Sequence, residues 1–130
     1  MEGLTDFERA VLKMLLAGDD PTLKVLRAQA EAGHLAERDY TGAGFFLSFR
    51  IPSSAPTLGV EEFHFGDVEA DIEGLRHGAG FVVFVRQGRL ASLEGYSYEE
   101  AWPHNIEKFH LSYQREPRHL SIPNGVSGIL

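Results

Sequence analysis

The chain has 130 residues, of which 43% are hydrophobic, 24% are charged and none is cysteine. This composition is typical of one globular domain that buries roughly two thirds of its unfolded surface without disulfides or a structural metal. The 12 Lys and Arg residues against 19 Asp and Glu give a net charge of −7. Binding to nucleic acid or to an anionic membrane needs an excess of cations on one face, so neither is expected.

The sequence also bears on where the protein works. No apolar run reaches the length of about 18 residues that a membrane-spanning helix needs. The first seven residues carry a net negative charge from Glu2 and Asp6, whereas a secretory signal peptide begins with basic residues. We therefore expect a cytoplasmic protein.

The N-terminal residues predict two helices. Thr5 and Glu8 have the spacing of a capping box, and apolar residues then recur at helical spacing at Phe7, Val11, Met14 and Leu15. Asp20 and Pro21 are a typical N-cap and first-turn pair for the second helix, which Gly33 is expected to end in a left-handed conformation. The short connection predicts an antiparallel pair.

From Tyr40 onward the apolar period changes to two, which predicts β-strands. Residues 45–51 and 109–113 alternate clearly between apolar and polar side chains. Residues 81–85 are apolar throughout, so we expect a central strand with a neighbour on each side. Gln87 and Gly88 then predict a two-residue turn.

One predicted strand changes its inward face. Apolar residues occupy odd positions before Gly66 and even positions after Asp67, so a bulge or a break is expected there. This register predicts two sets of side chains: Phe63, Phe65, Val68, Ala70 and Ile72 buried, and Asp67, Glu69, Asp71 and Glu73 exposed.

Together these elements predict an α+β fold, with two N-terminal antiparallel helices packed on one face of an antiparallel meander sheet of about five strands. A single domain would comprise a helical hairpin (1–34), a sheet (38–114) and an irregular C-terminal tail (115–130). The tail is too apolar to be solvated. We expect it to dock on its own domain or on a second copy, with Ile122 and Leu130 as anchors.

The stretch HGAGFVVFVRQGRLASLEGYSYEEAWP, residues 77–103, resembles a group of small bacterial proteins. The opening LTDFERAVLKMLLAGDDP and the TGAGFF at residues 41–46 extend the resemblance over residues 4–113. Ala101 departs from the pattern of the group, which favours Pro before the Trp. No activity is assigned to the group, so the resemblance implies a compact bacterial domain and transfers no functional residue.

The acidic strand is the first candidate site. Alternation along a strand places Asp67, Glu69, Asp71 and Glu73 on one face at intervals of about 7 Å. Such a row is typical of a solvated strand face or a charged edge. It would also suit docking of a basic partner. A flat row cannot converge on one calcium ion, so calcium binding is not expected.

The second candidate is a segment rich in aromatic and acidic residues. It offers a pocket lined by Glu94, Tyr96, Tyr98, Trp102 and His104, at a strand end and in a loop where binding residues often lie. The structural alternative is that Trp102 and one Tyr close the open end of the sheet, while the carboxylates stay in water.

No sequence pattern points to catalysis or to a bound metal. The six histidines form no H-x-H or H-x-x-x-H pair, and the serines lack a G-x-S-x-G elbow. The G-x-G pairs at 42–44 and 78–80 precede strands, whereas a dinucleotide loop opens a helix. We therefore predict no catalytic residue, no metal ligand and no cofactor.

These observations favour a non-enzymatic interaction protein that binds a basic protein through its acidic strand face, for example an immunity-type protein. One alternative is a small-molecule-binding or weakly catalytic domain that uses residues 96–104. A second alternative is a ligand-free homodimer paired through an edge strand.

Overall fold

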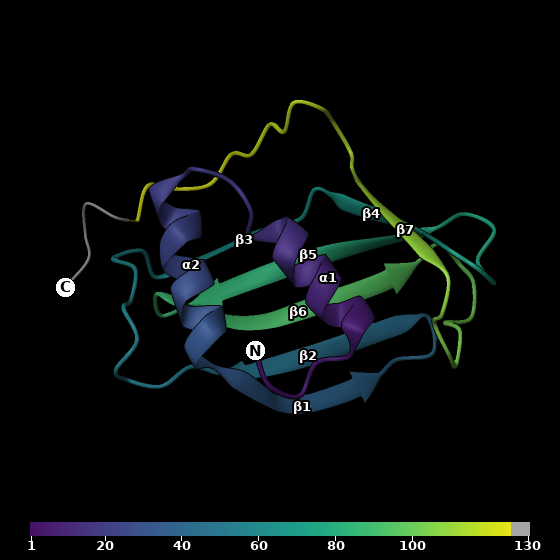
Figure 1. Cartoon of the computed structure of the whole chain (residues 1–130), viewed down its shortest axis with the longest axis horizontal. Coiled ribbons are helices and arrows are strands. Elements are labelled where there is room, and N and C mark those ends of the chain that lie inside the picture. Colours follow the sequence, from purple (N-terminus) through teal and green to yellow (C-terminus); the bar gives the residue numbers. More distant parts are fainter. Residues whose placement is uncertain (126–130) are drawn as a thin grey trace.

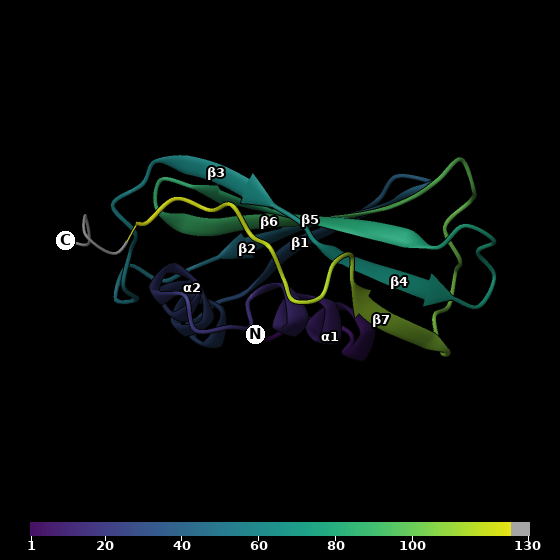
Figure 2. The same ribbon diagram turned by 90° about the horizontal axis from the view of Figure 1, so that it is seen from above.

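The computed structural model describes residues 1–125 and shows a twisted antiparallel sheet with both helices on one of its faces (Figure 1, Figure 2). The strand order is β1-β2-β6-β5-β4-β7, and β3 also pairs with β5. The elements are α1 (Asp6–Leu15), α2 (Pro21–Ala32), β1 (His34–Tyr40), β2 (Gly44–Arg50), β3 (Glu62–Phe65), β4 (Val68–Ile72), β5 (Ala79–Arg86), β6 (Arg89–Ser97) and β7 (Phe109–Tyr113).

The predicted α+β class is confirmed, and the sheet is larger than expected. It has seven strands rather than about five. Its order departs from a simple meander because β2 pairs with β6, while β3 and β4 lie on the far side of β5. Packing decides which distant strands pair with one another. The alternation of apolar and polar residues within one strand does not predict its partner.

Both helix starts follow the predicted chemistry. The Thr5 hydroxyl accepts a hydrogen bond from the Glu8 amide at 3.1 Å, and the Glu8 carboxylate accepts from the Thr5 amide at 2.9 Å. The Asp20 carboxylate accepts from the Thr22 amide at 2.8 Å at the start of α2. These caps satisfy amides that have no partner within the helix.

The end of α2 differs from the prediction. Gly33 has a φ of −89°, so the expected left-handed conformation is wrong and the chain passes directly into β1. A Cβ on Gly33 would lie 2.6 Å from Cδ1 of Ile51 and 3.0 Å from the carbonyl oxygen of Arg50, so glycine eases close packing here. The sequence analysis missed β1 and began the sheet at residue 38. As an edge strand with a register shift between Leu35 and Glu37, β1 is mostly exposed and lacks clear alternation.

The predicted break at Gly66 is confirmed. It separates β3 from β4, which pair in turn with the two halves of β5. A Cβ on Gly66 would lie 1.9 Å from the carbonyl oxygen of Phe81, so a side chain cannot fit at this crossing. Four of the five predicted inward residues are buried. Phe63 is half-buried, because β3 is an edge strand that pairs with β5 on one side.

Strand β5 is central, as predicted, with β6 on one side and β3 and β4 on the other. Phe81, Val83 and Val85 are buried beneath the helices. Val82 and Phe84 are half-buried on the opposite face, which neither helix covers (Figure 2). The apolar character of both faces therefore reflects full burial on one face and a half-buried apolar patch on the other.

The β5–β6 connection explains an irregular sequence pattern. Gln87 and Gly88 have φ values of 54° and 73°, as a type I′ hairpin turn requires. The register shifts within β6, where Leu90 rather than Ala91 pairs with Val85. This bulge lets Leu90 and Leu93 both point into the core despite their opposite parity.

The chain after β7 returns along the helices to the start of α2 (Figure 1). The Thr22 hydroxyl donates to the Pro123 carbonyl at 3.2 Å and accepts from the Gly125 amide at 3.1 Å. Ile122 packs against the core as expected. The tail up to residue 125 thus docks on its own domain, and the second predicted anchor, Leu130, lies outside the described residues.

Candidate functional site

The four predicted carboxylates do not form one row. Glu69 and Asp71 are exposed on β4 as expected, but Glu73 lies beyond the end of that strand, 3.9 Å from the Lys108 ammonium group. Asp67 lies at the break between β3 and β4, where its side chain is only 13% exposed. The expectation that Asp67 is exposed is wrong because the change of face begins at this residue.

Asp67 has a structural role. Its carboxylate accepts two hydrogen bonds from Arg118, both at 2.8 Å. Arg118 also donates to the carbonyl oxygens of Leu15 and Ala17 at the C-terminal end of α1. This carboxylate is fully engaged inside the domain and is not available to a partner.

The sheet face opposite the helices is covered by neither helix (Figure 2). We call it the open face and assign residues to it by strand alternation and cross-strand register. Its centre is apolar, with Phe46 on β2, Val82 and Phe84 on β5, and Tyr96 on β6. Its carboxylates are Glu37, Asp39, Glu62, Glu69, Asp71 and Glu94, and its arginines are Arg50, Arg86 and Arg89.

The register sets apolar and acidic groups side by side. Glu94 lies between Phe46 on β2 and Val82 on β5. One row further along, the Phe84 ring lies 5.6 Å from the His64 ring, measured between ring centroids. Phe46 keeps 39% of its surface exposed, which is unusual for a phenylalanine that has sheet neighbours on both sides.

Tyr96 lies across Gly80 on this face. A Cβ on Gly80 would lie 2.5 Å from the phenolic oxygen of Tyr96, so the glycine makes room for the ring. Partial burial raises the pKa of the Tyr96 phenol, with further contributions from Tyr98 and from the carboxylates of Glu94 and Glu69. The phenol therefore stays protonated and can donate a hydrogen bond at neutral pH.

A polar hollow adjoins Tyr96. Its volume is about 130 Å³, and Glu69, Asp71, His77, Tyr98 and Ser112 line it. Ligand pockets usually measure roughly 300 to 1,000 Å³. The hollow is therefore large enough for a few waters or for one side chain of a partner, and too small for an ordinary substrate.

The predicted aromatic pocket is divided between two faces. Glu94 and Tyr96 lie on the open face and Tyr98 lines the polar hollow, whereas Trp102 is buried among the core rings. The Trp102 ring lies 5.3 Å from the Phe45 ring, so the structural alternative of a plug describes Trp102 well. Trp102 and His104 line a separate cavity of about 500 Å³ near the start of α1.

Glu100 has a structural role that its position in the sequence does not reveal. Its carboxylate accepts hydrogen bonds from the amides of Arg76 and His77, at 2.9 and 3.0 Å. These two hydrogen bonds lower the pKa of Glu100 below its ordinary value. The contact fixes the turn before β5 against the segment after β6. No sequence signal identified Glu100 among its acidic neighbours.

Two kinds of feature are absent from residues 1–125. No group of three or more His, Asp or Glu side chains in this range is placed to hold a metal ion. Nor do these residues include a helix with the length and apolar character to span a membrane.

Searches against protein-family models, curated proteins and solved structures find no significant match to this chain. These searches therefore add no support to the resemblance described for residues 4–113.

Proposed function

We propose that the protein is a non-enzymatic binding module whose open face docks on a basic protein. The observation that carries the proposal is the group of aromatic and aliphatic side chains on this face, with the Glu94 carboxylate among them and further carboxylates around them. Protein interfaces commonly combine apolar contact surface with polar and charged groups. An immunity-type protein that neutralises a basic toxin is one example of the class.

Each part of the face has a distinct role in this proposal. Phe46 and Phe84 supply apolar surface that loses water when a partner docks. The carboxylates of Asp39, Glu69 and Asp71 attract a basic surface over long range and set its orientation. Of the four carboxylates expected from the sequence, only Glu69 and Asp71 belong to the docking surface.

The test begins with capture of partners on the immobilised chain, followed by binding measurements with each purified partner. For a true partner, the association constant should fall at least about tenfold between 50 and 500 mM salt, because exposed charges are screened. The double variant Glu69→Lys/Asp71→Lys should lower the association rate more than it raises the dissociation rate.

A matched control reverses charge on the helix side of the molecule. Glu31→Lys changes the net charge by the same amount per site, but Glu31 lies on α2, away from the open face. Glu31→Lys should alter the association rate less than Glu69→Lys or Asp71→Lys does when each is made alone. An affinity that is insensitive to salt and to the β4 variants would refute the proposal.

The cavity near the start of α1, which Trp102 and His104 line, favours a second candidate function, the binding of a small molecule. Its volume of about 500 Å³ is within the usual range for ligand sites, and Tyr40, Trp102 and His104 contribute to its lining. Trp102 is the only tryptophan of the chain, so its fluorescence reports directly on this cavity. A saturable fluorescence change with one member of a fragment library would support this candidate, and no change with any member would count against it.

A further inference from the structure

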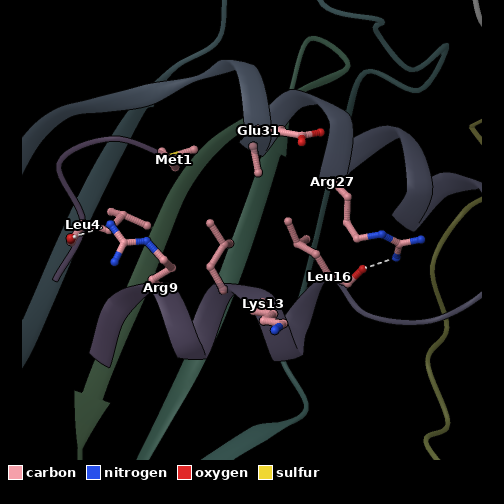
Figure 3. Close-up of a pocket in the computed structure, with 9 residues that line it drawn as sticks. Met1, Leu4, Arg9, Lys13, Leu16, Arg27 and Glu31 are labelled. Atoms are coloured by element: carbon pink, nitrogen blue, oxygen red, sulfur yellow. Dashed lines mark hydrogen bonds between the residues drawn. The ribbon is translucent and has the colours of Figure 1, made fainter. Parts of the chain in front are cut away.

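A groove separates α1 and α2 on the helix side of the molecule (Figure 3). Its volume is about 490 Å³, comparable to that of an ordinary ligand pocket. Leu12 of α1 and Leu16, the residue just after that helix, lie along its floor with little of their surface exposed. Ala30 faces them from α2 with a side chain too short to bridge the two helices. Leu4 and Met1 extend the apolar surface.

The groove is basic, although the chain as a whole is acidic. Arg9, Lys13 and Arg27 line it, and Glu31 is its one carboxylate. The whole chain has a net charge of −7, so the groove lining has the opposite sign to the chain as a whole. An anionic group is therefore attracted to this groove and repelled by the open face.

The two arginines are held in place by carbonyl groups. Arg9 donates to the Leu4 carbonyl at 3.1 Å, and Arg27 donates to the carbonyls of Leu16 and Gly18 at the end of α1 (Figure 3). Arg9 also donates to the Asp6 carboxylate at 3.3 Å, so part of its charge is already compensated. These contacts fix both guanidinium groups at the edges of the groove.

Lys13 is the cation with the most freedom to meet a ligand. It is exposed on α1, between the positions of the two arginines (Figure 3). Among residues 1–125, no carboxylate lies within 4 Å of its ammonium group. A bound anion would supply the partner that the described structure does not provide.

From this geometry we propose that the groove binds a single-chain alkyl carboxylate, of the fatty-acid type. The alkyl chain lies along Leu12, Leu16 and Ala30, and the carboxylate meets Lys13. The lining is aliphatic and includes no aromatic ring on which a nucleobase could stack. The site lies on the side of the sheet opposite the open face, so the proposal is independent of the proposed function.

The test uses calorimetric titration of the full chain with dodecanoate, below the concentration at which the ligand forms micelles. We expect saturable binding of one ligand per chain. Dodecyltrimethylammonium has the same alkyl chain with a cationic head, and it should bind at least about tenfold more weakly. Equal binding of both ligands would overturn the proposal, because it would show hydrophobic adsorption without charge recognition.

Charge reversal provides the matched pair of variants. Lys13→Glu should weaken dodecanoate binding about tenfold. Lys24→Glu makes the same change at an exposed position of α2 that does not line the groove, and it should leave the affinity within about twofold. Equal effects of the two variants, or no binding of dodecanoate to the native chain, would refute the proposal.

A second variant tests the apolar part of the groove. Ala30→Trp fills the space opposite Leu12 and should abolish binding, whereas Ala32→Trp places the same ring at an exposed position outside the groove lining. Circular dichroism and the melting temperature show whether each variant is folded. Undiminished binding by folded Ala30→Trp would place the ligand elsewhere and overturn the assignment.

Discussion

The guanidinium group of Arg118 holds the Asp67 carboxylate through two hydrogen bonds of 2.8 Å. Only 16% of the Arg118 side chain and 13% of the Asp67 side chain are exposed. The same guanidinium group lies over the Tyr113 ring, with its central carbon 4.4 Å from the ring centroid. One side chain from the C-terminal segment thus connects α1, the break between β3 and β4, and the end of β7.

Arg118→Met should lower the free energy of unfolding by about 2 to 4 kcal/mol, because it leaves a poorly solvated carboxylate without its partner. Urea titration measures this change. Arg115→Met removes the same charge from an exposed position of the same segment and should cost less than about 0.5 kcal/mol. If both variants had similar stability, the Arg118–Asp67 pair would not hold the domain together.

Phe81 and Phe84 lie on opposite faces of β5 and should differ in their contributions to stability. Phe81 is 1% exposed beneath the helices, so Phe81→Ala should cost about 3 to 5 kcal/mol through lost burial and an unfilled cavity. Phe84 is half-buried on the open face, so Phe84→Ala should cost only about 1 kcal/mol. The expectation from sequence that residues 81–85 form the central, least accessible strand would assign the larger cost to Phe84 as well. Denaturant titration of both variants decides between the two descriptions.

Gln29 is a fully buried amide that joins α2 to the β5–β6 hairpin. Its nitrogen donates to the carbonyls of Pro56 and Gly88, and its oxygen accepts from the Leu90 amide at 2.8 Å. Gln29→Met keeps a similar shape and removes the hydrogen bonds of the buried Leu90 amide and of the Pro56 carbonyl, whereas the Gly88 carbonyl still accepts from the Leu58 amide, so the substitution should cost about 2 to 4 kcal/mol.

Thermal and urea unfolding would measure the effect of this substitution. Gln114→Met serves as the control because Gln114 is exposed. A loss no greater than that of the control would mean that the backbone groups near Gln29 find other partners.

Glu100 predicts a dependence of stability on pH. Its pKa in the folded protein lies below the ordinary value of 4.5, so its contribution is complete above that value. The contribution is lost as the pH falls through the lowered pKa, because the unfolded chain takes up the proton first.

Melting temperatures between pH 7 and pH 3 test this linkage. Glu100→Gln should lose stability at neutral pH and show a shallower decline in acid than the native chain. Glu99→Gln, at the neighbouring exposed position, should keep the native acid profile. Parallel curves for the native chain and Glu100→Gln would contradict the role assigned to the two amide contacts.

Features that depend on near neighbours in the chain were predictable. The capping box of Thr5 and Glu8 and the N-cap at Asp20 follow from hydrogen bonds within one helical turn. The break at Gly66 follows from the change of apolar parity, and the Gln87–Gly88 turn from the two-residue spacing. In each case the backbone conformation is decided by residues at most a few positions apart.

The sites depended on contacts between distant segments. Asp67 and Glu69 are alike in the sequence, but Arg118, far along the chain, pairs with Asp67 and leaves Glu69 free. Gln29 occupies the helical spacing of the buried residues Thr22 and Leu26, so a polar residue on a buried stripe was a signal that could have been recognised.

The sequence by itself determined the fold class, the positions of both helices and most strands, and the acidic character of the chain. Only the tertiary structure decided that β2 pairs with β6, that one sheet face stays uncovered, and that a basic groove lies between the helices. The physical reason is that helix starts and strand alternation arise from local backbone chemistry. Strand order, burial of single carboxylates and groove shape arise from packing among segments that the sequence pattern does not relate to one another.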